Sequence, residues 1–267
     1  MPELPEVEVT RRRIERQLLG KSFTQVELRV KKLRLPIPPD LAETLSGLTV
    51  RAINRRSKYL LFDCGSGWLL IHLGMTGFLR LLSGFSVPGK HDHVDFVFND
   101  GQVLRFHDPR KFGIITWIAG DPLQHPLLVD IGPEPLDGTF DGAYLFAVSR
   151  GRKVAVKQLI MNSEVVAGVG NIYANESLFR AGIRPDRISG NVTFSECTKL
   201  AAVIRDVLEG SITGGSTYRV AEETVAYYPQ EFSVYGRRGK PCPACGELLE
   251  EIRPGNRSTV FCGICQK

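Results

Sequence analysis

The first eighteen residues carry a narrow apolar stripe on an otherwise charged segment. Its members recur at spacings of three, seven and four, as on one face of a helix: Leu4, Val7, Ile14 and Leu18. Pro5 falls in the first turn, where its missing N–H costs little. Glutamates precede the arginines of "RRRIER", an order that suits the helix dipole. The pattern therefore predicts a helix that ends before Gly20.

Between residue 22 and about residue 118, short stretches rich in β-branched and aromatic residues replace the helical spacing. The strand-like stretches are 22–30, 48–64, 68–82, 93–100, 102–108 and 112–119. The sequence "NDG" at 99–101 is a hairpin signal between two of them. Several short strands at this spacing predict a β-sandwich or a barrel, of which we favour the sandwich.

The rest of the chain is helical and then rich in cysteine. Residues 120–142 are rich in Pro, Gly and Asp, which indicates a linker. Helical patterns follow at 152–161, 171–182 and 194–212. We therefore expect an α+β multidomain chain. Its segments are a β-sandwich domain with the first helix at 1–130, a linker or hinge at 131–149, a helical domain at 150–233 and a zinc finger at 234–267.

Composition and charge narrow the classes of protein that fit. The 267 residues are 43% hydrophobic and contain no apolar run of 18 residues, so we expect no membrane-spanning segment. No secretory signal is visible, which favours a cytosolic protein. The formal net charge is +5, and base is concentrated in two segments. Residues 150–187 hold seven Lys/Arg against three Asp/Glu, and residues 237–267 hold six against three. This clustering favours a partner with a phosphate backbone, although solvated basic faces would give the same counts.

Four of the six cysteines form two C-x2-C pairs, Cys242 with Cys245 and Cys262 with Cys265, with sixteen residues between the pairs. Each pair can place two thiolates on one side of a tight turn, and two pairs complete a tetrahedron around Zn²⁺. Four thiolates leave no open coordination position, so we predict one structural zinc rather than a catalytic one. Two disulfides are the alternative, which the lack of a secretory signal disfavours.

A glycine-rich turn precedes the second predicted helix. Gly168 and Gly170 of "GVGN" allow close approach of the backbone to a ligand, and Asn171 is the expected N-cap. Backbone N–H groups at such a helix start can bind phosphate. Arg257 lies inside the predicted zinc hairpin, where a guanidinium can probe a phosphate or a groove. A plain helical hairpin and a solvated arginine are the alternatives, but the two features together favour DNA binding.

Pro2 would carry a free secondary amine once Met1 is removed. Because α-amino groups titrate near ~8, this amine would be partly unprotonated at neutral pH and could attack an aldehydic or glycosidic carbon. The resulting iminium is an electron sink that lets the adjacent carbon lose a proton. Glu3 is adjacent and could serve as general acid or base. An N-terminal Pro-Glu is more commonly only the start of a helix.

Motifs spread over the whole chain resemble the bacterial formamidopyrimidine-DNA glycosylases (Fpg). In the family's order they are "PELPEVE" at 2–8, "RRSKYLLF" at 55–62, "HLGMTGFLR" at 72–80, "DPRKFG" at 108–113, "GVGNIYANESLF" at 168–179 and "VYGRRGKPC" at 234–242. The terminal cysteine pairs resemble the family's zinc finger, and residues 150–233 its helix-two-turn-helix DNA-binding domain. The resemblance implies a bifunctional DNA glycosylase and AP lyase of base excision repair. Such an enzyme excises 8-oxoguanine and formamidopyrimidines from duplex DNA and nicks the strand by β,δ-elimination.

The resemblance also implies roles for single residues. Pro2 would attack C1′ of the damaged nucleotide and form a Schiff base, with Glu3 as proton donor. Glu6 would support the site through local hydrogen bonds. Lys58 would contact the phosphate or the lesion and assist β-elimination. Arg257 would bind phosphate and assist δ-elimination.

Further residues match positions that contact DNA in the family, namely His91, Arg110, Lys153 and Asn171. Met75, Arg110 and Phe112 match the wedge that fills the gap left when a damaged base leaves the stack. Two apolar fillers and one arginine that can bond the orphaned opposite base suit that task. Without the resemblance, Met75 and Phe112 would be interpreted as core residues.

One segment departs from the family pattern. Between residues 217 and 234 the family carries a longer loop, which contains glycine and folds over the flipped purine. The loop of this chain is shorter by about three residues and has no glycine, although backbone contacts to a base require flexibility. The alternative is therefore the same chemistry with a preference for oxidised pyrimidines, as in the endonuclease VIII type.

A non-catalytic zinc protein that binds damaged DNA is a further alternative, since it would share all the binding features. It gives no reason for Pro2, Glu3 and Lys58 to occur together. We expect a monomer that clamps one site of double-stranded DNA across a hinge near residues 132–138, with no membrane partner, in the cytoplasm of a bacterium.

Overall fold

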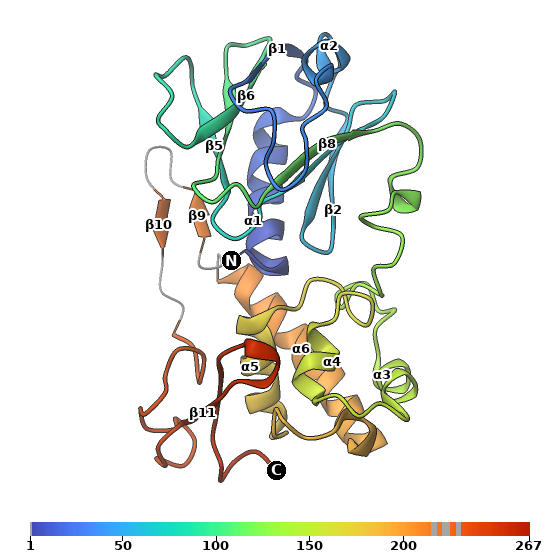
Figure 1. Ribbon diagram of the computed structural model, residues 1–267, viewed down its shortest axis with the longest axis vertical. Helices are drawn as coiled ribbons and strands as arrows, with labels where there is room; N and C mark the ends of the chain where they lie inside the picture. Colours follow the sequence, from blue (N-terminus) through green and yellow to red (C-terminus); the bar gives the residue numbers. More distant parts are fainter. Residues whose placement is uncertain (1, 215–217, 221–224, 228–230) are drawn as a thin grey trace. The chain divides into compact units, whose positions relative to one another are not determined.

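A computed structural model describes residues 2–214, 218–220, 225–227 and 231–267, with side chains left out between 215 and 230. The chain divides into two compact units (Figure 1). Unit 1 comprises residues 1–129 and 215–228, and unit 2 comprises residues 130–214 and 229–267.

Helix α1 (Leu4–Leu18) opens unit 1 and confirms the helix predicted from the apolar stripe. All four stripe residues are at most 1% exposed, so the stripe is the face that packs into the core. Pro5 lies in the first turn, where no intrahelical hydrogen bond is lost. Arg11 lies on the same side of the helix, between Val7 and Ile14, and bridges Glu8 and Glu15 at 3.0 and 2.7 Å.

Two antiparallel four-stranded sheets follow, and they identify a sandwich rather than a barrel. One sheet has the order β1-β6-β7-β5, with β1 (Phe23–Leu28), β5 (Phe78–Leu82), β6 (Asp92–Phe98) and β7 (Val103–His107). The other has the order β2-β3-β4-β8, with β2 (Ala52–Arg56), β3 (Tyr59–Asp63), β4 (Trp68–His72) and β8 (Ile114–Ile118). Apolar residues of α1 and both sheets form one hydrophobic core, which accounts for the packing of the sheets.

The structure divides two of the predicted strand-like stretches. The stretch 48–64 contains β2 and β3, which turn at Ser57, a residue with φ of 53°. The stretch 68–82 contains β4 and β5, separated by a turn in which Gly74 has φ of 68°. Hydrophobic patterning did not show these breaks because apolar residues continue on both sides of each turn. It also missed the short helix α2 (Leu41–Leu45), whose two leucines are fully buried. The remaining elements of unit 1 are η1 (Pro122–Gln124), β9 (Tyr218–Val220) and β10 (Val225–Tyr227).

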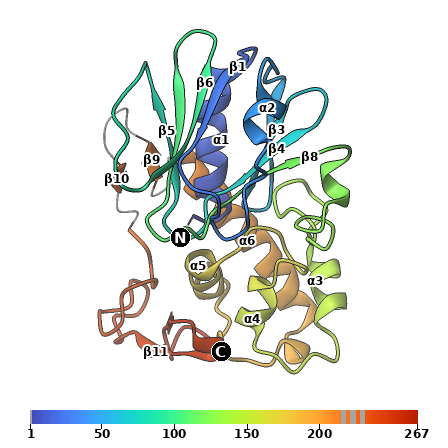
Figure 2. The same ribbon diagram turned by 45° about the horizontal axis from the view of Figure 1, so that its top comes forward.

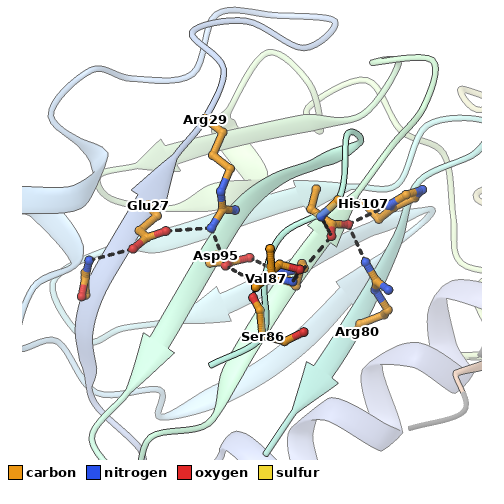
Figure 3. A network of polar contacts seen from close by, with 11 residues as sticks. Glu27, Arg29, Arg80, Ser86, Val87, Asp95 and His107 are labelled. Atoms are coloured by element: carbon orange, nitrogen blue, oxygen red, sulfur yellow. Dashed lines mark hydrogen bonds and ion pairs between the residues drawn. The ribbon is translucent and has the colours of Figure 1, made fainter. Parts of the chain in front are cut away.

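A network of charged side chains lies on the β1-β6-β7-β5 sheet (Figure 3). Arg105, 2% exposed, donates two hydrogen bonds of 2.7 Å to the carboxylate of Asp95. Arg29 donates to the same carboxylate at 2.6 Å. Arg105 also donates to the carbonyl of Ser86 at 2.7 Å, which ties the β5–β6 loop to the sheet. Burial alone would raise the pKa of Asp95, but hydrogen bonds from Arg105 and Arg29 hold that pKa below its ordinary value.

Unit 2 is built around a long helix (Figure 2). Its helices are α3 (Gly142–Ser149), α4 (Val156–Met161), α5 (Asn171–Ala181) and α6 (Phe194–Thr213), with a 3-10 turn η2 (Ser189–Asn191). Helices α3 and α5 both pack against α6. Thr193 caps α6, with Glu196 completing a capping box. Among the described residues, no helix has the length and apolar character needed to cross a bilayer.

Three details of unit 2 differ from the sequence-based expectation. Helix α3 lies within the range 131–149, which we expected to be a linker. Its start is set by Asp141, whose carboxylate accepts from the N–H of Tyr144 at 2.7 Å. Helix α4 begins at Val156 rather than near residue 152. Asn171 is the first helical residue of α5, and Gly170 takes the N-cap position.

The C-terminal segment forms a small finger on α5. Strands β11 (Glu250–Ile252) and β12 (Thr259–Phe261) pair as a hairpin joined by η3 (Pro254–Asn256). The N–H of Val260 donates to the side chain of Asn175 in α5 at 2.9 Å. Upstream, the buried carboxylate of Glu176 accepts from the N–H groups of Ser233, Val234 and Tyr235 at 2.8 to 2.9 Å. The fold therefore confirms the predicted architecture of sandwich, helical region and hairpin finger.

Removal of Asp95 should destabilise unit 1 strongly, because Arg105 would remain buried without its bidentate partner. We expect Asp95→Ala to lower the free energy of unfolding by about 3–5 kcal/mol, measured by urea denaturation. The exposed Glu43→Ala in α2 is the control and should change little. Since the folded-state pKa of Asp95 is lowered, its contribution exists above the unfolded pKa of about 3.9 and is lost as the pH falls through the folded value. An equal destabilisation by both substitutions would contradict this assignment.

Candidate functional site

The N-terminal end of α1 is buried and held by hydrogen bonds. Pro2 is buried, and Glu3 and Glu6 are each 1% exposed. The N–H of Glu3 donates to Oε2 of Glu6 at 2.8 Å, and the Thr10 hydroxyl donates to the carbonyl of Glu6 at 2.8 Å. The first turn of the helix therefore fixes the backbone of residue 3 and, through it, the position of Pro2.

A charged cluster connects the same helix to the turn that carries Lys58. Glu8 accepts from Arg11, from Arg12 at 2.7 Å and from Arg55 at 3.1 Å. Arg55 also donates to the carbonyl of Ser57 at 2.9 Å, directly before Lys58. Burial alone would raise the pKa of Glu8, but its arginine partners keep that pKa below the ordinary value. Glu8 is therefore a fixed anion, which positions the β2–β3 turn through Arg55.

His72, at the end of β4, is a neighbour of Lys58 that motif analysis did not single out. Its pKa is lowered to about 4, first by burial and then by the positive charges of Lys58 and Arg34. Its Nδ1 accepts from the N–H of Gly74 at 3.1 Å, and its ring packs on Tyr59 with centroids 4.7 Å apart. His72 is therefore a neutral hydrogen-bond acceptor beside Lys58 at neutral pH. The sequence signal that could have identified His72 is its position as a histidine at the end of an apolar strand.

Met75 and the pair Arg110 and Phe112 lie on two loops that pack on one another. Phe112 is 41% exposed, and the Arg110 guanidinium lies 4.6 Å from the centroid of its ring. Gly74 approaches the neighbouring loop so closely that a Cβ there would lie 2.5 Å from the Phe112 carbonyl carbon. Phe112 is therefore not the core residue that its pattern indicated. Met75 is partly buried in the turn after β4.

His91 stands before β6, next to these loops. Its carbonyl accepts from the N–H of Asp108 at 3.0 Å, and its ring meets that of His107 edge-on with centroids 5.8 Å apart. The following residue, Asp92, accepts from the N–H of Gly89 at 2.7 Å and lies 2.7 Å from Nδ1 of His107. These contacts define the backbone around a half-buried imidazole.

In unit 2, Asn171 and the finger are joined by a buried lysine that motif analysis also missed. Lys157, 1% exposed, donates to Oδ1 of Asn171 at 2.7 Å, to the Thr259 hydroxyl at 2.6 Å and to the Ser258 carbonyl at 3.1 Å. Asn171 also donates to the Ser258 carbonyl at 3.0 Å. The start of α5 and the residue after Arg257 are thus brought together. Both Arg257 and Lys153 are exposed, the latter in the segment before α4.

The four cysteines of the two C-x2-C pairs come together in the finger. Their sulfur atoms all lie within 4.8 Å of one another, with 3.9 Å between Cys242 and Cys265 and 3.5 Å between Cys245 and Cys262. Tetrahedral coordination with Zn–S bonds of about 2.3 Å places sulfurs about 3.8 Å apart, so the geometry fits Zn²⁺. None of these cysteines forms a disulfide, which excludes the alternative. The chain thus carries one structural zinc site with no open coordination position.

The predicted residues therefore fall into two sets. Unit 1 contains the N-terminal end, the Lys58 turn, the paired loops and His91. Unit 2 contains Lys153, Asn171, Arg257 and the cysteines. Sequence motifs identified both exposed members, such as Arg110 and Arg257, and buried ones, such as Pro2, Glu3 and Glu6. They did not identify the buried partners His72, Asp108 and Lys157, whose hydrogen-bond partners are set by the tertiary structure.

Comparisons with known proteins agree with this arrangement. The model of the formamidopyrimidine-DNA glycosylase N-terminal domain matches residues 1–115, that of its H2TH domain residues 131–222, and that of the zinc finger found in FPG and IleRS residues 239–267. A formamidopyrimidine-DNA glycosylase of Geobacter metallireducens is 65% identical over 266 residues, covering 100% of both chains.

Solved structures resemble the chain over its full length. A complex of Lactococcus lactis Fpg (MutM) with DNA containing FAPY-dG superimposes with a TM-score of 0.91 at 33% identity, covering 99% of this chain and 100% of that chain. A complex of MutM with DNA containing carbocyclic 8-oxo-G gives a TM-score of 0.90 at 34% identity, covering 100% of both chains.

The sandwich with its N-terminal helix, the H2TH region and the four-cysteine finger define a DNA-repair enzyme of the glycosylase class. The chain belongs to the formamidopyrimidine-DNA glycosylase family. Members of this family are DNA glycosylases and AP lyases of base excision repair, and this chain is such an enzyme, with DNA as its partner. Family membership sets the non-catalytic alternative aside.

Lys58→Met should raise the pKa of His72 above about 4, because one of the charges that repel the imidazolium is lost. The new pKa should stay below about 6.5, since burial is the larger cause. Titration of the imidazole signals by NMR measures the change, with the exposed Lys153→Met as control. In the wild type, a folded pKa below the unfolded value means that stability is lost as the pH falls from about 6.5 to about 4. If the pKa of His72 did not change in Lys58→Met, the charge of Lys58 would not be a cause of its lowered value.

Zinc should be bound at one ion per chain and should depend on the finger cysteines alone. Cys262→Ser should lose most of the zinc and unfold the finger, which would weaken DNA binding because the loop with Arg257 loses its support. Metal analysis of the purified chain and DNA titration measure both effects. The buried Cys64→Ala in unit 1 is the matched control and should keep full zinc content. Unaltered zinc in Cys262→Ser would contradict the assignment.

Proposed function

We propose that this enzyme excises oxidised purines, chiefly 8-oxoguanine and formamidopyrimidines, from duplex DNA, with Pro2 as nucleophile. The observation that carries the proposal is the buried end of α1, where the carboxylate of Glu6 accepts from the N–H of Glu3 and fixes the reactive residues. Support also comes from the relatives, since the solved complexes hold DNA with FAPY-dG and with carbocyclic 8-oxo-G. The proposal requires that Met1 be removed, because only then does Pro2 present a free amine.

The chemistry needs no oxidant or external cofactor. The Pro2 nitrogen forms a bond to C1′, the N-glycosidic bond breaks, and the base leaves with a proton. Glu3 then protonates O4′ as the sugar ring opens, which gives the iminium. The iminium accepts the electron pair when C2′ loses a proton, and the bond from C3′ to its phosphate breaks. A second elimination releases the phosphate at C5′, and hydrolysis frees the amine.

Basic and amide side chains would hold the phosphates around the lesion. Lys58 would contact the phosphate or the lesion in β-elimination, beside a neutral His72 that adds no competing charge. Arg257 would bind phosphate and assist δ-elimination, on a loop that Lys157 ties to Asn171. His91, Lys153 and Asn171 would contact the DNA backbone, which fixes register without reading sequence.

The exposed loop residues suit the task of keeping the duplex open. Excision requires the target base to leave the stack, and the vacated space needs a filler. Met75 and Phe112 would supply apolar surface, and Arg110 would hydrogen-bond the orphaned base opposite. The exposure of Phe112 supports this role, since a large apolar side chain at the surface has a cost without a partner.

The lesion range depends on the loop between residues 217 and 234, of which residues 217, 221–224 and 228–230 lie outside the described residues. Its shortness and lack of glycine favour testing oxidised pyrimidines as a second substrate class. We propose further that the enzyme acts as a monomer in the bacterial cytoplasm. The proposed segments are 1–130, 131–149, 150–233 and 234–267, with a hinge in the second of them.

Borohydride trapping tests the proposed nucleophile. The Met1-processed protein should form a covalent protein–DNA band with duplexes that carry 8-oxoguanine or a formamidopyrimidine, because the reductant fixes the iminium. Pro2→Gly should reduce the band, and mass analysis should place the DNA on the N-terminal residue. Glu3→Gln should lower base excision by 100-fold or more, on the order of the contribution of a general acid.

The lesion panel decides between the two substrate classes. A band only on an oxidised pyrimidine would keep Pro2 and overturn the preference for purines. An intact band in Pro2→Gly with the DNA attached to a lysine would overturn the nucleophile.

A further inference from the structure

We propose that Asp108 is a positioning residue that couples the two loops of the wedge, so that Met75 enters the duplex together with Arg110 and Phe112. The inference rests on the wedge role proposed for those three residues. It concerns a buried side chain that touches neither substrate nor nucleophile. The coupled loops are residues 73–77, after β4, and residues 108–113, before β8.

The carboxylate of Asp108 is fully buried and bonds to both loops. Its Oδ1 accepts from the Thr76 hydroxyl at 2.8 Å, in the first loop. Its Oδ2 accepts from the N–H of Gly113 at 2.8 Å, and Oδ1 lies 3.3 Å from the N–H of Arg110. One carboxylate therefore links the two loops directly by hydrogen bonds.

The backbone of Asp108 is held equally firmly. Its carbonyl accepts from Nε2 of His93 at 2.9 Å and from the N–H of Lys111 at 3.2 Å. Its N–H donates to the carbonyl of His91. Lys111 adopts φ of 56°, a left-handed conformation that costs free energy for a non-glycine residue. The bonds from Asp108 to both sides of Lys111 stabilise that turn and set the direction of its neighbours.

Close packing leaves the loops little freedom to move separately. A Cβ on Gly74 would lie 2.5 Å from the carbonyl carbon of Phe112. A Cβ on Gly113 would lie 2.9 Å from the carbonyl oxygen of His72 and 3.2 Å from Oδ2 of Asp108. Interfaces packed this tightly have discrete arrangements rather than continuous ones. The loops therefore present Met75, Arg110 and Phe112 as one rigid surface.

A rigid wedge is useful only when paired bases must be opened. Inserting apolar side chains into a stack costs a few kcal/mol per step. If the two loops are already ordered, the free-energy cost of ordering them is not added to the cost of insertion. A substrate without an opposite strand needs no wedge, so loss of the coupling should spare it. This difference separates a positioning role from a general loss of folding.

The experiment compares two substrates for each variant. The first is a duplex with 8-oxoguanine opposite cytosine, and the second is a single strand with a preformed abasic site. Asp108→Asn keeps the size of the side chain but replaces one acceptor oxygen by a donor that faces an N–H. We expect kcat/KM on the duplex to fall about tenfold and strand cleavage of the single-stranded abasic site to change less than twofold. Equal losses on the two substrates would overturn the proposal.

Thr76 supplies a second, milder test that does not depend on the folding of Asp108→Asn. Thr76→Val removes the hydroxyl at nearly constant volume and should lower duplex activity several-fold, whereas Thr76→Ser should retain it. In the double variant Thr76→Val/Asp108→Asn, the losses should be less than additive, because both substitutions break the same link. Additive losses, or full duplex activity in Thr76→Val, would overturn the coupling.

Arg110→Ala and Phe112→Ala distinguish this proposal from the proposed function. If both lower duplex activity while Thr76→Val and Asp108→Asn do not, the wedge stands and the coupling is wrong. If neither lowers duplex activity, the wedge role fails and the inference fails with it. Borohydride trapping on the single-stranded abasic site should succeed in Thr76→Val and Asp108→Asn, which checks Pro2 independently.

Discussion

Hydrogen bonds from backbone N–H groups to buried carboxylates are the interaction on which the functional segments depend. Glu6 fixes the residue next to Pro2, Asp108 holds the paired loops, and Glu176 holds residues 233–235 ahead of the finger. All three carboxylates are buried, and a buried polar group without hydrogen-bond partners is costly, so each one requires its N–H donors in place. Each turn also depends on its carboxylate, because without that acceptor the N–H groups of the turn would have to bond to water. The candidate functional residues are thereby attached to buried hydrogen-bonded anchors.

The positively charged groups at the site are also held by specific partners. Lys157 is buried but bonded to three oxygen atoms, and it joins the start of α5 to the loop after Arg257. Lys58 lies beside a histidine that stays neutral, so the two do not compete for a phosphate. In the finger, the four-cysteine zinc site adds to a small hydrophobic cluster that includes Val234, Leu249 and Val260. Under the proposed function, these contacts would position Lys58 and Arg257 to bind phosphate.

Sequence patterns worked where structure depends on neighbours in the chain. The stripe of α1 and the two C-x2-C pairs are local signals, and the structure bears them out. Patterns failed where a break or a start depends on distant contacts. Ser57 adopts a left-handed turn within the polar run "RRSK" between two strands, and α3 begins at Gly142, after its N-cap Asp141, inside a segment rich in Pro and Gly. Phe112 has the spacing of a core residue, yet the loop that carries it faces solvent.

The sequence by itself determined the class of enzyme, the zinc ligands and the candidates for nucleophile and phosphate contacts, because these are motifs of fixed residue type and spacing. Only the tertiary structure decided which buried residues support them. Asp108 meets Thr76 across 32 positions, and Lys157 meets Ser258 across 101. Such pairs follow from the way sheets and helices pack, since no local pattern in the chain encodes a partner so distant. The strongest supports of the site are therefore the residues that sequence patterns show least.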